Sequence, residues 1–202
     1  MRLFSASLVL LGLLGAPALA QQSDGPIATA ASQGEAQASV RLREALAYSN
    51  PLPTGAPTAD YPLVAWCDAL VTGHADLGET LTNRTPEDAE LVRLGRLEAQ
   101  DFRSALAVAE PRQSAAAKAE ARAAAAAAKA KWTPLLEQTD ERVRSESFGL
   151  FFGLPGRCEH AARRIRDNIT TPPATPADVG LREATPADVG FREATPAETP
   201  AS

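Results

Sequence analysis

Residues 65–77 read AWCDALVTGHADL and contain one of the two cysteines and one of the two histidines of this 202-residue chain. The other cysteine and the other histidine lie in FFGLPGRCEHAARRI, residues 151–165. The fold depends on how Cys67 and Cys158 are used, because they lie near the two ends of the predicted core. They can form a disulfide with each other, or they can bind a metal ion together with the two histidines.

Both cysteines lie on one face of a predicted helix. The first helix begins near Asp60, its expected N-cap. Residues at spacings of three and four define its inward face: Leu63, Cys67, Leu70, His74, Leu77 and Leu81. The last helix begins after GLPG, residues 153–156, and its inward face carries Cys158, Ala161, Ala162, Ile165 and Ile169. Because both faces must point into the core, the two sulfur atoms can meet.

The N-terminus has the pattern of a cleavable signal peptide over residues 1–20. Arg2 is a minimal positive region, residues 8–14 are an apolar run too short to span a bilayer, and residues 18–20 (ALA) form a cleavage site. We expect cleavage near Ala20 and a mature chain in the periplasm or outside the cell, with no membrane-spanning segment. A transmembrane anchor is the alternative interpretation of the same residues.

This compartment favours the disulfide over the metal site. Two cysteines and no third, in an oxidising space, predict a bond between Cys67 and Cys158. The alternative metal ligands are His74 and His160, but closely paired spacings such as C-x₂-C are missing. We therefore expect no metal and no cofactor, with His74 partly buried and His160 exposed beside the arginines of the last helix.

The rest of the core also carries helix signals. Thr85-Pro86, followed by two acidic residues, is a typical helix start. Residues 114–132, SAAAKAEARAAAAAAKAKW, are rich in alanine, which has the best helix propensity. Pro134 then either kinks this helix or begins a new one. Because no segment alternates with the period of a strand, the prediction is an all-α fold: a small bundle of about four to five helices with one disulfide.

Residues 57–169 form the expected helical domain, and the segments on either side are expected to be flexible. Residues 21–56 could form one short helix at 35–48, with Leu42 and Leu46 on one side.

The C-terminal segment, residues 170–202, contains ATPADVGLRE, ATPADVGFRE and ATPAE in tandem from Ala174. Proline in each repeat interrupts helices, and one apolar side chain after each glycine cannot bury a core. We therefore expect a disordered tail. The alternative is a multivalent ligand anchored by Leu181 and Phe191.

Two groups of basic residues are candidate contacts with an anionic partner. Lys118, Arg122 and Lys129 lie within about 40° of one another on the alanine-rich helix. The second group lies on the last helix: Arg163, Arg164 and Arg166. A solvated face on a helix that packs through its alanines is the alternative explanation of the first group. The net charge of −5 provides no basic surface of the kind that binds nucleic acid, so we expect no nucleic-acid partner.

Two segments resemble uncharacterised secreted proteins of alphaproteobacteria. These are PLPTGAPTADYPLVAWCDAL, residues 51–70, and FFGLPGRCEHAA, residues 151–162, which match an xYxxVxWC helix start and a GxPxRCE segment. The resemblance covers residues 51–169 and implies an exported helical domain with one disulfide. It implies no activity and no ligand.

The chain contains no G-x-S-x-G, H-E-x-x-H, P-loop or dinucleotide-binding motif. The leading functional hypothesis is therefore a non-enzymatic module of the cell envelope that binds a protein or polymer there, or has a structural role. The alternative is a periplasmic carrier of a small ligand or metal, which would use the bundle interior near Trp66, His74 and Trp132. An enzyme with an unfamiliar site is the third hypothesis.

Overall fold

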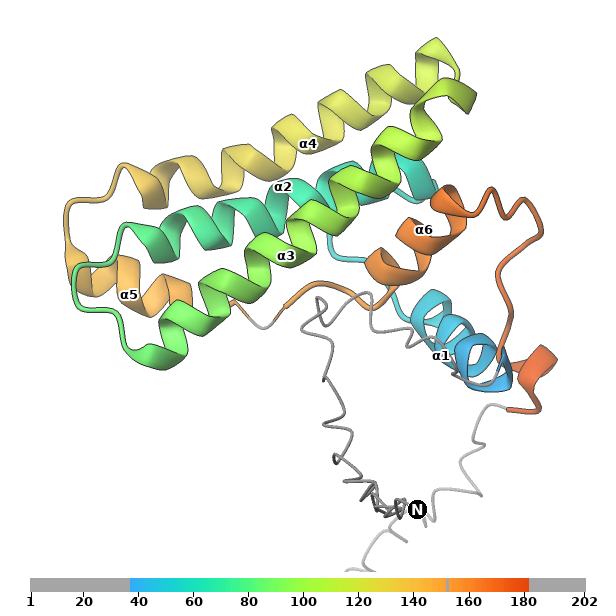
Figure 1. Cartoon of the computed structure of the whole chain (residues 1–202), viewed down its shortest axis with the longest axis horizontal. Helices are drawn as coiled ribbons and strands as arrows, with labels where there is room; N and C mark the ends of the chain where they lie inside the picture. Colours follow the sequence, from blue (N-terminus) through green and yellow to red (C-terminus); the bar gives the residue numbers. More distant parts are fainter. Residues whose placement is uncertain (1–36, 152, 182–202) are drawn as a thin grey trace, which may run out of the picture.

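The computed structural model describes residues 37–151 and 153–181, and the regular elements of this part of the chain are all helices (Figure 1). The α-helices are α1 (Gln37–Ser49), α2 (Asp60–Glu79), α3 (Pro86–Ala109), α4 (Ala115–Leu136), α5 (Glu141–Gly149) and α6 (Arg157–Arg166). Two short 3₁₀ helices complete the list: η2 (Glu110–Arg112) and η3 (Ala177–Val179). The prediction of a small all-α bundle with one disulfide is confirmed.

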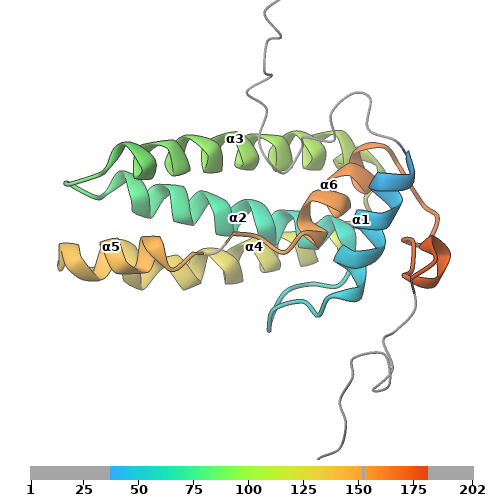
Figure 2. The same ribbon diagram turned by 90° about the horizontal axis from the view of Figure 1, so that it is seen from below.

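Helix α2 is the centre of the bundle, with α3 and α4 packed on either side of it (Figure 2). It is apolar around most of its circumference, as expected for a helix that is covered on several sides. Leu63, Val64, Trp66 and Leu77 are almost fully buried. Helix α6 lies across one end of the α2–α3 layer, and α1 lies against α6.

The disulfide joins α2 to α6. Cys67 and Cys158 are 91 residues apart in sequence, and their Cα atoms lie 6.1 Å apart. Both side chains are almost fully buried within the main apolar cluster. The inward orientation predicted from helical spacing is therefore confirmed for both cysteines.

Local sequence signals place several helix ends where they were expected. Thr85 accepts a hydrogen bond from the amide of Asp88, whose carboxylate accepts one from the amide of Thr85, so the two residues form a capping box. Ser114 caps α4 through the amide of Ala117. Pro134 neither begins nor ends a helix, because α4 continues through it to Leu136.

Asp60 was expected to cap α2, but in the structure it does not. The N-cap position is Ala59, and Asp60 lies in the first turn. Its carboxylate accepts hydrogen bonds from the Tyr48 hydroxyl, at 2.6 Å, and from the Arg164 side chain, at 3.0 Å. Contacts with α1 and α6 thus replace the local cap.

Close approach of α4 and α5 to α2 depends on two glycines. A Cβ atom at Gly73 would lie 2.1 Å from the Trp132 indole, and one at Gly78 would lie 2.5 Å from the Phe148 ring. Because no side chain fits at these positions, the aromatic rings pack directly on the α2 backbone. Ala121 and Ala128 are also buried, so α4 packs through its alanines.

Helix α1 occurs where a short helix was expected, but its leucines do not provide the packing. Leu42 and Leu46 are 38% and 45% exposed. The buried residues of α1 are Glu44 and Ala45. The helix is therefore held by a polar contact rather than by an apolar stripe.

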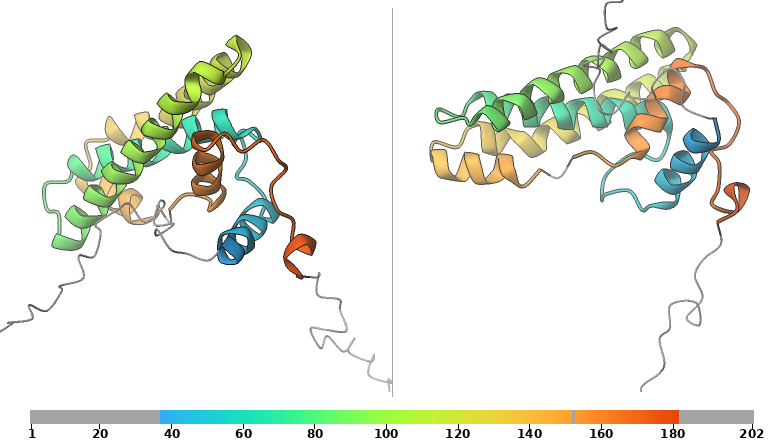
Figure 3. Two further views of the ribbon diagram at one scale, coloured as in Figure 1. Left: turned by 45° about the vertical axis from the view of Figure 1, so that its right-hand side comes forward. Right: turned by 60° about the horizontal axis from the view of Figure 1, so that its bottom comes forward.

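A disordered tail was expected from residue 170, and this expectation is wrong for residues 170–181. Residues 170–181 return to α1, and η3 packs against that helix (Figure 3). Ala174 is 7% exposed, and its amide donates a hydrogen bond to Glu44. Apolar side chains alone do not indicate this docking, because its anchors are hydrogen bonds to Glu44 and Arg164. Residues 182–202, like residues 1–36 with the expected signal peptide, lie outside the described part of the chain.

Candidate functional site

A cavity of about 530 Å³ lies between α2, α3 and the segment that connects α5 to α6. Its walls are mainly apolar: Val71, Leu91, Leu94, Phe148, Phe151 and Leu154. Three polar side chains, His74, Glu98 and Glu159, are also part of its lining. Small-molecule sites commonly have this size and this combination of apolar walls with a few polar groups.

His74 is held between aromatic rings at the inner side of the cavity. Its imidazole stacks on Phe148 at a centroid distance of 4.3 Å and on Phe151 at 4.4 Å. Burial lowers the pKa of His74, which keeps the ring neutral. Its Nε2 lies 3.0 Å from the carbonyl oxygen of Phe148 and therefore carries the proton, because a carbonyl can only accept. His74 thus has a structural hydrogen bond, and its ring packs against Phe148 and Phe151.

Glu98 is the unusual group of the cavity. Burial raises the pKa of its carboxyl to about 7, and the negative charges of Glu159 and Asp101 add to this shift. Glu159 lies 3.8 Å from the side chain of Arg43, and Asp101 lies 2.6 Å from that of Arg166. For Glu98 itself, the described residues provide neither an ion-pair partner nor a hydrogen-bond partner.

The chemistry of this arrangement favours a cationic group on a bound molecule. An opposite charge beside Glu98 would stabilise its ionised form and offset the repulsion from Glu159. The apolar walls would cover a hydrocarbon portion of the same molecule. A ligand carboxylate would instead add a third negative charge.

Of the predicted contact residues of the last helix, Arg164 is buried, and Arg163 and Arg166 are half-buried in ion pairs with other helices. Arg164 is 5% exposed and contacts both Glu44, at 3.3 Å, and Asp60, at 3.0 Å. Arg163 lies 3.0 Å from Glu44, and Arg166 is bonded to Asp101. The expectation of exposed arginines on this helix is therefore wrong: they tie α6 to α1, α2 and α3.

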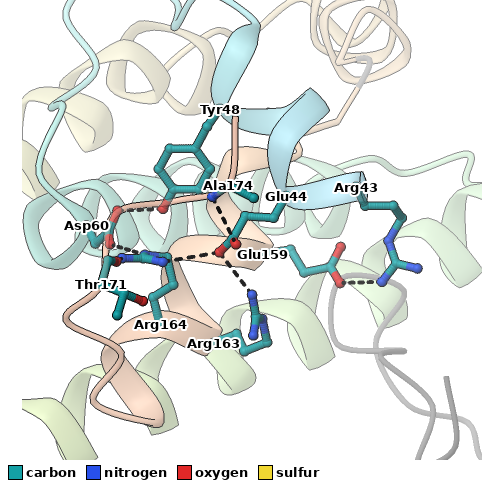
Figure 4. Close-up of polar contacts among 9 residues, drawn as sticks. All are labelled: Arg43, Glu44, Tyr48, Asp60, Glu159, Arg163, Arg164, Thr171 and Ala174. Atoms are coloured by element: carbon teal, nitrogen blue, oxygen red, sulfur yellow. Dashed lines mark hydrogen bonds and ion pairs between the residues drawn. The ribbon is translucent and has the colours of Figure 1, made fainter. Parts of the chain in front are cut away.

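Figure 4 shows how these contacts converge on Glu44. Its carboxylate accepts hydrogen bonds from Arg163, from Arg164 and from the amide of Ala174. Arg164 also donates to the carbonyl of Thr171. A single buried carboxylate thus joins α1 to α6 and to the segment after α6, which lie 119 to 130 residues farther along the chain.

The other predicted basic group lies at the edge of the packed face of α4. Lys118 lies 3.5 Å from the carboxylate of Glu110. Arg122 and Lys129 are exposed. These two residues remain accessible to an anionic partner.

The alternative metal ligands do not form a site. Cys67 and Cys158 are bonded to each other and cannot bind a metal ion as thiolates. His160, expected to be exposed, is 3% exposed. Within residues 37–151 and 153–181, no group of three or more His, Cys, Asp or Glu side chains is placed to hold a metal ion.

Of the three residues expected near a ligand, only His74 lines the cavity. The Trp132 ring lies beside His74, with a distance of 5.9 Å between the two ring centroids. Sequence reasoning missed Glu98. The signal was present, because Leu91, Leu94 and Phe102 define the apolar stripe of α3 and Glu98 lies in the same helical register. A charged residue inside such a stripe calls for a partner or a ligand.

Among the helices that the structure describes, none combines the length and the apolar character needed to cross a membrane. Comparisons of the chain with protein-family models, with curated proteins and with solved structures give no match.

Proposed function

We propose that this protein is an exported, non-enzymatic helical module whose cavity between α2 and α3 binds a small apolar molecule with a cationic head group. The observation that carries the proposal is Glu98, a carboxyl with no partner among residues 37–151 and 153–181, in the lining of a mainly apolar cavity of about 530 Å³. The buried disulfide supports an oxidising compartment such as the periplasm or the extracellular space.

This proposal keeps the small-ligand hypothesis and replaces the metal with an organic cation. It also explains why His74 has a hydrogen-bond partner among the described residues and Glu98 does not. His74 is neutral and already bonded to Phe148. Glu98 is left to contact the ligand, and it gains a counter-ion when the site is filled.

Isothermal titration calorimetry with three probes of equal chain length tests the proposal. Decylammonium, decanol and decanoate present a cationic, a neutral and an anionic head on the same hydrocarbon. At pH 8, where Glu98 is ionised, decylammonium should bind tightest and decanoate weakest. At pH 7 its binding should release protons, seen as a dependence of the heat on the buffer.

Two variants place the binding in this cavity. Glu98→Gln should abolish the preference for decylammonium over decanol. Leu91→Trp should weaken all binding, because Leu91 lines the cavity yet is 49% exposed and can be enlarged without disturbing the core. Val108→Trp is the matched control, since Val108 is 48% exposed on the same helix and lies outside the lining. Equal binding of the three probes, or no effect of Glu98→Gln, would refute the proposal.

A second candidate function rests on Arg122 and Lys129, which are exposed on α4. They would contact an anionic polymer or lipid surface of the envelope. Sedimentation with phosphatidylglycerol vesicles should then exceed sedimentation with phosphatidylcholine vesicles. Arg122→Glu with Lys129→Glu should remove the difference, and the absence of any difference in the unmodified protein would refute this candidate.

A further inference from the structure

Residues 174–180, the first seven residues of the first decapeptide repeat, are seated on the surface formed by α1 and α6. Ala174 is buried there, and its amide bonds to Glu44. Three residues upstream, the carbonyl of Thr171 accepts a hydrogen bond from Arg164. The repeat and the two helices enclose a cavity of about 690 Å³ whose lining includes Arg41, Arg163 and Asp178. The repeat is therefore a bound peptide that happens to be part of the same chain.

The bound shape is made by the repeat itself. The hydroxyl and amide of Thr175 both donate to the carboxylate of Asp178, at 2.7 and 2.8 Å. The amide of Asp178 donates back to the Thr175 hydroxyl, at 3.3 Å. The turn ends at Gly180, whose φ of +76° glycine adopts at no steric cost.

These seven residues recur without change. Residues 174–180 and residues 184–190 both read ATPADVG. The first difference after these seven residues is Phe191 in place of Leu181. Leu181 is 40% exposed, so a phenylalanine at the same place can extend into solvent. The contact of Arg164 is with a backbone carbonyl, which Leu181 would supply three residues before the second copy.

We propose that the α1–α6 surface is a binding site for the sequence ATPADVG, and that residues 184–190 occupy it in exchange with residues 174–180. The proposal is independent of the ligand cavity beside α3. It identifies the occupant as a segment of this chain, because every side chain of residues 174–180 recurs in residues 184–190. The preceding residues differ, since Arg182 and Glu183 stand where Pro172 and Pro173 precede the first copy.

Chain length sets the balance between the two copies. The second copy begins ten residues farther from α6, and loops of roughly seven and seventeen residues differ about fourfold in closure probability. With equal contacts, the first copy is favoured by about that factor. A tenfold preference or more would require contacts that the second copy lacks.

Hydrogen exchange of the full chain tests the exchange of copies. Ala174→Trp blocks the first copy, because a large side chain has no room at a position that is 7% exposed. Ala184→Trp is the matched change in the second copy, and the third variant carries both. The readout is amide exchange in residues 37–49, the helix that the repeat covers.

Ala184→Trp alone should behave as the unmodified protein. Ala174→Trp should accelerate exchange by no more than about fivefold, because the second copy, bound in about one fifth of the molecules before the change, takes the site. The double variant should accelerate it by tenfold or more. Equal exchange rates in Ala174→Trp and the double variant would overturn the proposal. Rates in Ala174→Trp that depend on protein concentration would also overturn it, since the second copy would then bind another molecule.

Discussion

The carboxylate of Glu44 and the guanidinium of Arg164 lie 3.3 Å apart between α1 and α6, and their side chains are only 8% and 5% exposed. Buried charges of this kind are tolerated only when each has well-placed partners. Glu44 also bonds Arg163 and the amide of Ala174, and Arg164 also bonds Asp60. The attachment of both flanking segments to the disulfide-linked core therefore depends on one ion-pair cluster.

Replacing Glu44 with alanine should destabilise the protein by about 3 kcal/mol, the lower end of the range for removing one partner of a buried ion pair. The lower end applies because Asp60 still bonds Arg164. Urea unfolding followed by circular dichroism measures the loss. The control is Glu146→Ala, which removes an exposed pair with Arg142 and should change stability by less than about 0.5 kcal/mol. Equal effects of the two changes would contradict the role of burial.

Replacing Cys67 and Cys158 together with alanine should cost about 2–5 kcal/mol, as is typical for disulfides of small secreted domains. Both thiols are removed so that no free cysteine can form dimers. Reduction of the unmodified protein should lower its denaturation midpoint to that of the variant. A reduced protein as stable as the oxidised one would show that the bond contributes nothing to folding.

Gly73→Ala and Gly95→Ala should have opposite effects although both glycines lie within helices. At Gly73 the new Cβ would lie 2.1 Å from Trp132, so the indole must move, at a cost of about 1–3 kcal/mol. At Gly95 the nearest atom is 3.5 Å away, and alanine should stabilise the helix by up to about 1 kcal/mol. Thermal denaturation of the two variants decides the matter; similar shifts would refute the close packing of Trp132.

Stability should depend on pH through Glu98. Folding raises the pKa of this carboxyl from 4.5 to about 7, so the folded state holds its proton more tightly than the unfolded state. Relative to Glu98→Gln, the unmodified protein should lose stability as the pH rises from about 4.5 to about 7, and the difference should then stay level. Because Glu98 is partly exposed, the loss should be on the order of 1–2 kcal/mol.

His74 is present in both proteins, so the difference between them isolates Glu98. Denaturant titrations at pH 4.5, 6, 7 and 8 provide the measurement. A difference that grows in the opposite direction, with the unmodified protein gaining stability as the pH rises, would show that the carboxyl has a favourable partner.

Truncation after residue 169 should lower the melting temperature, whereas truncation after residue 181 should not. The shorter chain loses the contacts of Arg164 with Thr171 and of Glu44 with Ala174. The longer chain keeps both. Differential scanning calorimetry of the two truncated proteins checks the prediction, and equal melting temperatures would indicate that the docked segment adds no stability.

Features that depend on neighbouring residues were predictable from the sequence. Thr85 and Ser114 cap their helices because the amides they bond lie three residues away. Cys67 and Cys158 were also predictable, although distant, since they are the only two cysteines and both lie on inward faces. In these cases each residue had one plausible partner.

Features that depend on a choice among many distant partners were not predictable. Asp60 bonds Arg164, 104 residues away, instead of capping its own helix. The arginines of α6 were expected to be exposed, because nothing in the sequence shows that Glu44 and Asp101, on separate helices, are their partners. The cavity beside Glu98 likewise arises only when α3 meets the segment between α5 and α6. Helical periodicity fixes which side of a helix a residue occupies, but not which helix will face it.

The bond between Cys67 and Cys158 makes residues 67–158 a covalent ring. Helix α1 and residues 170–181 lie outside this ring, so each is an arm joined to it by the backbone at one end only. A protease that cuts once inside the ring, for instance in the turn at residues 137–140, would leave both pieces connected through sulfur. The same cut in an arm would release a fragment. If the protein is exported as proposed, the ring keeps its full mass after a single cut, and α1 and residues 170–181 are the parts that proteolysis can release.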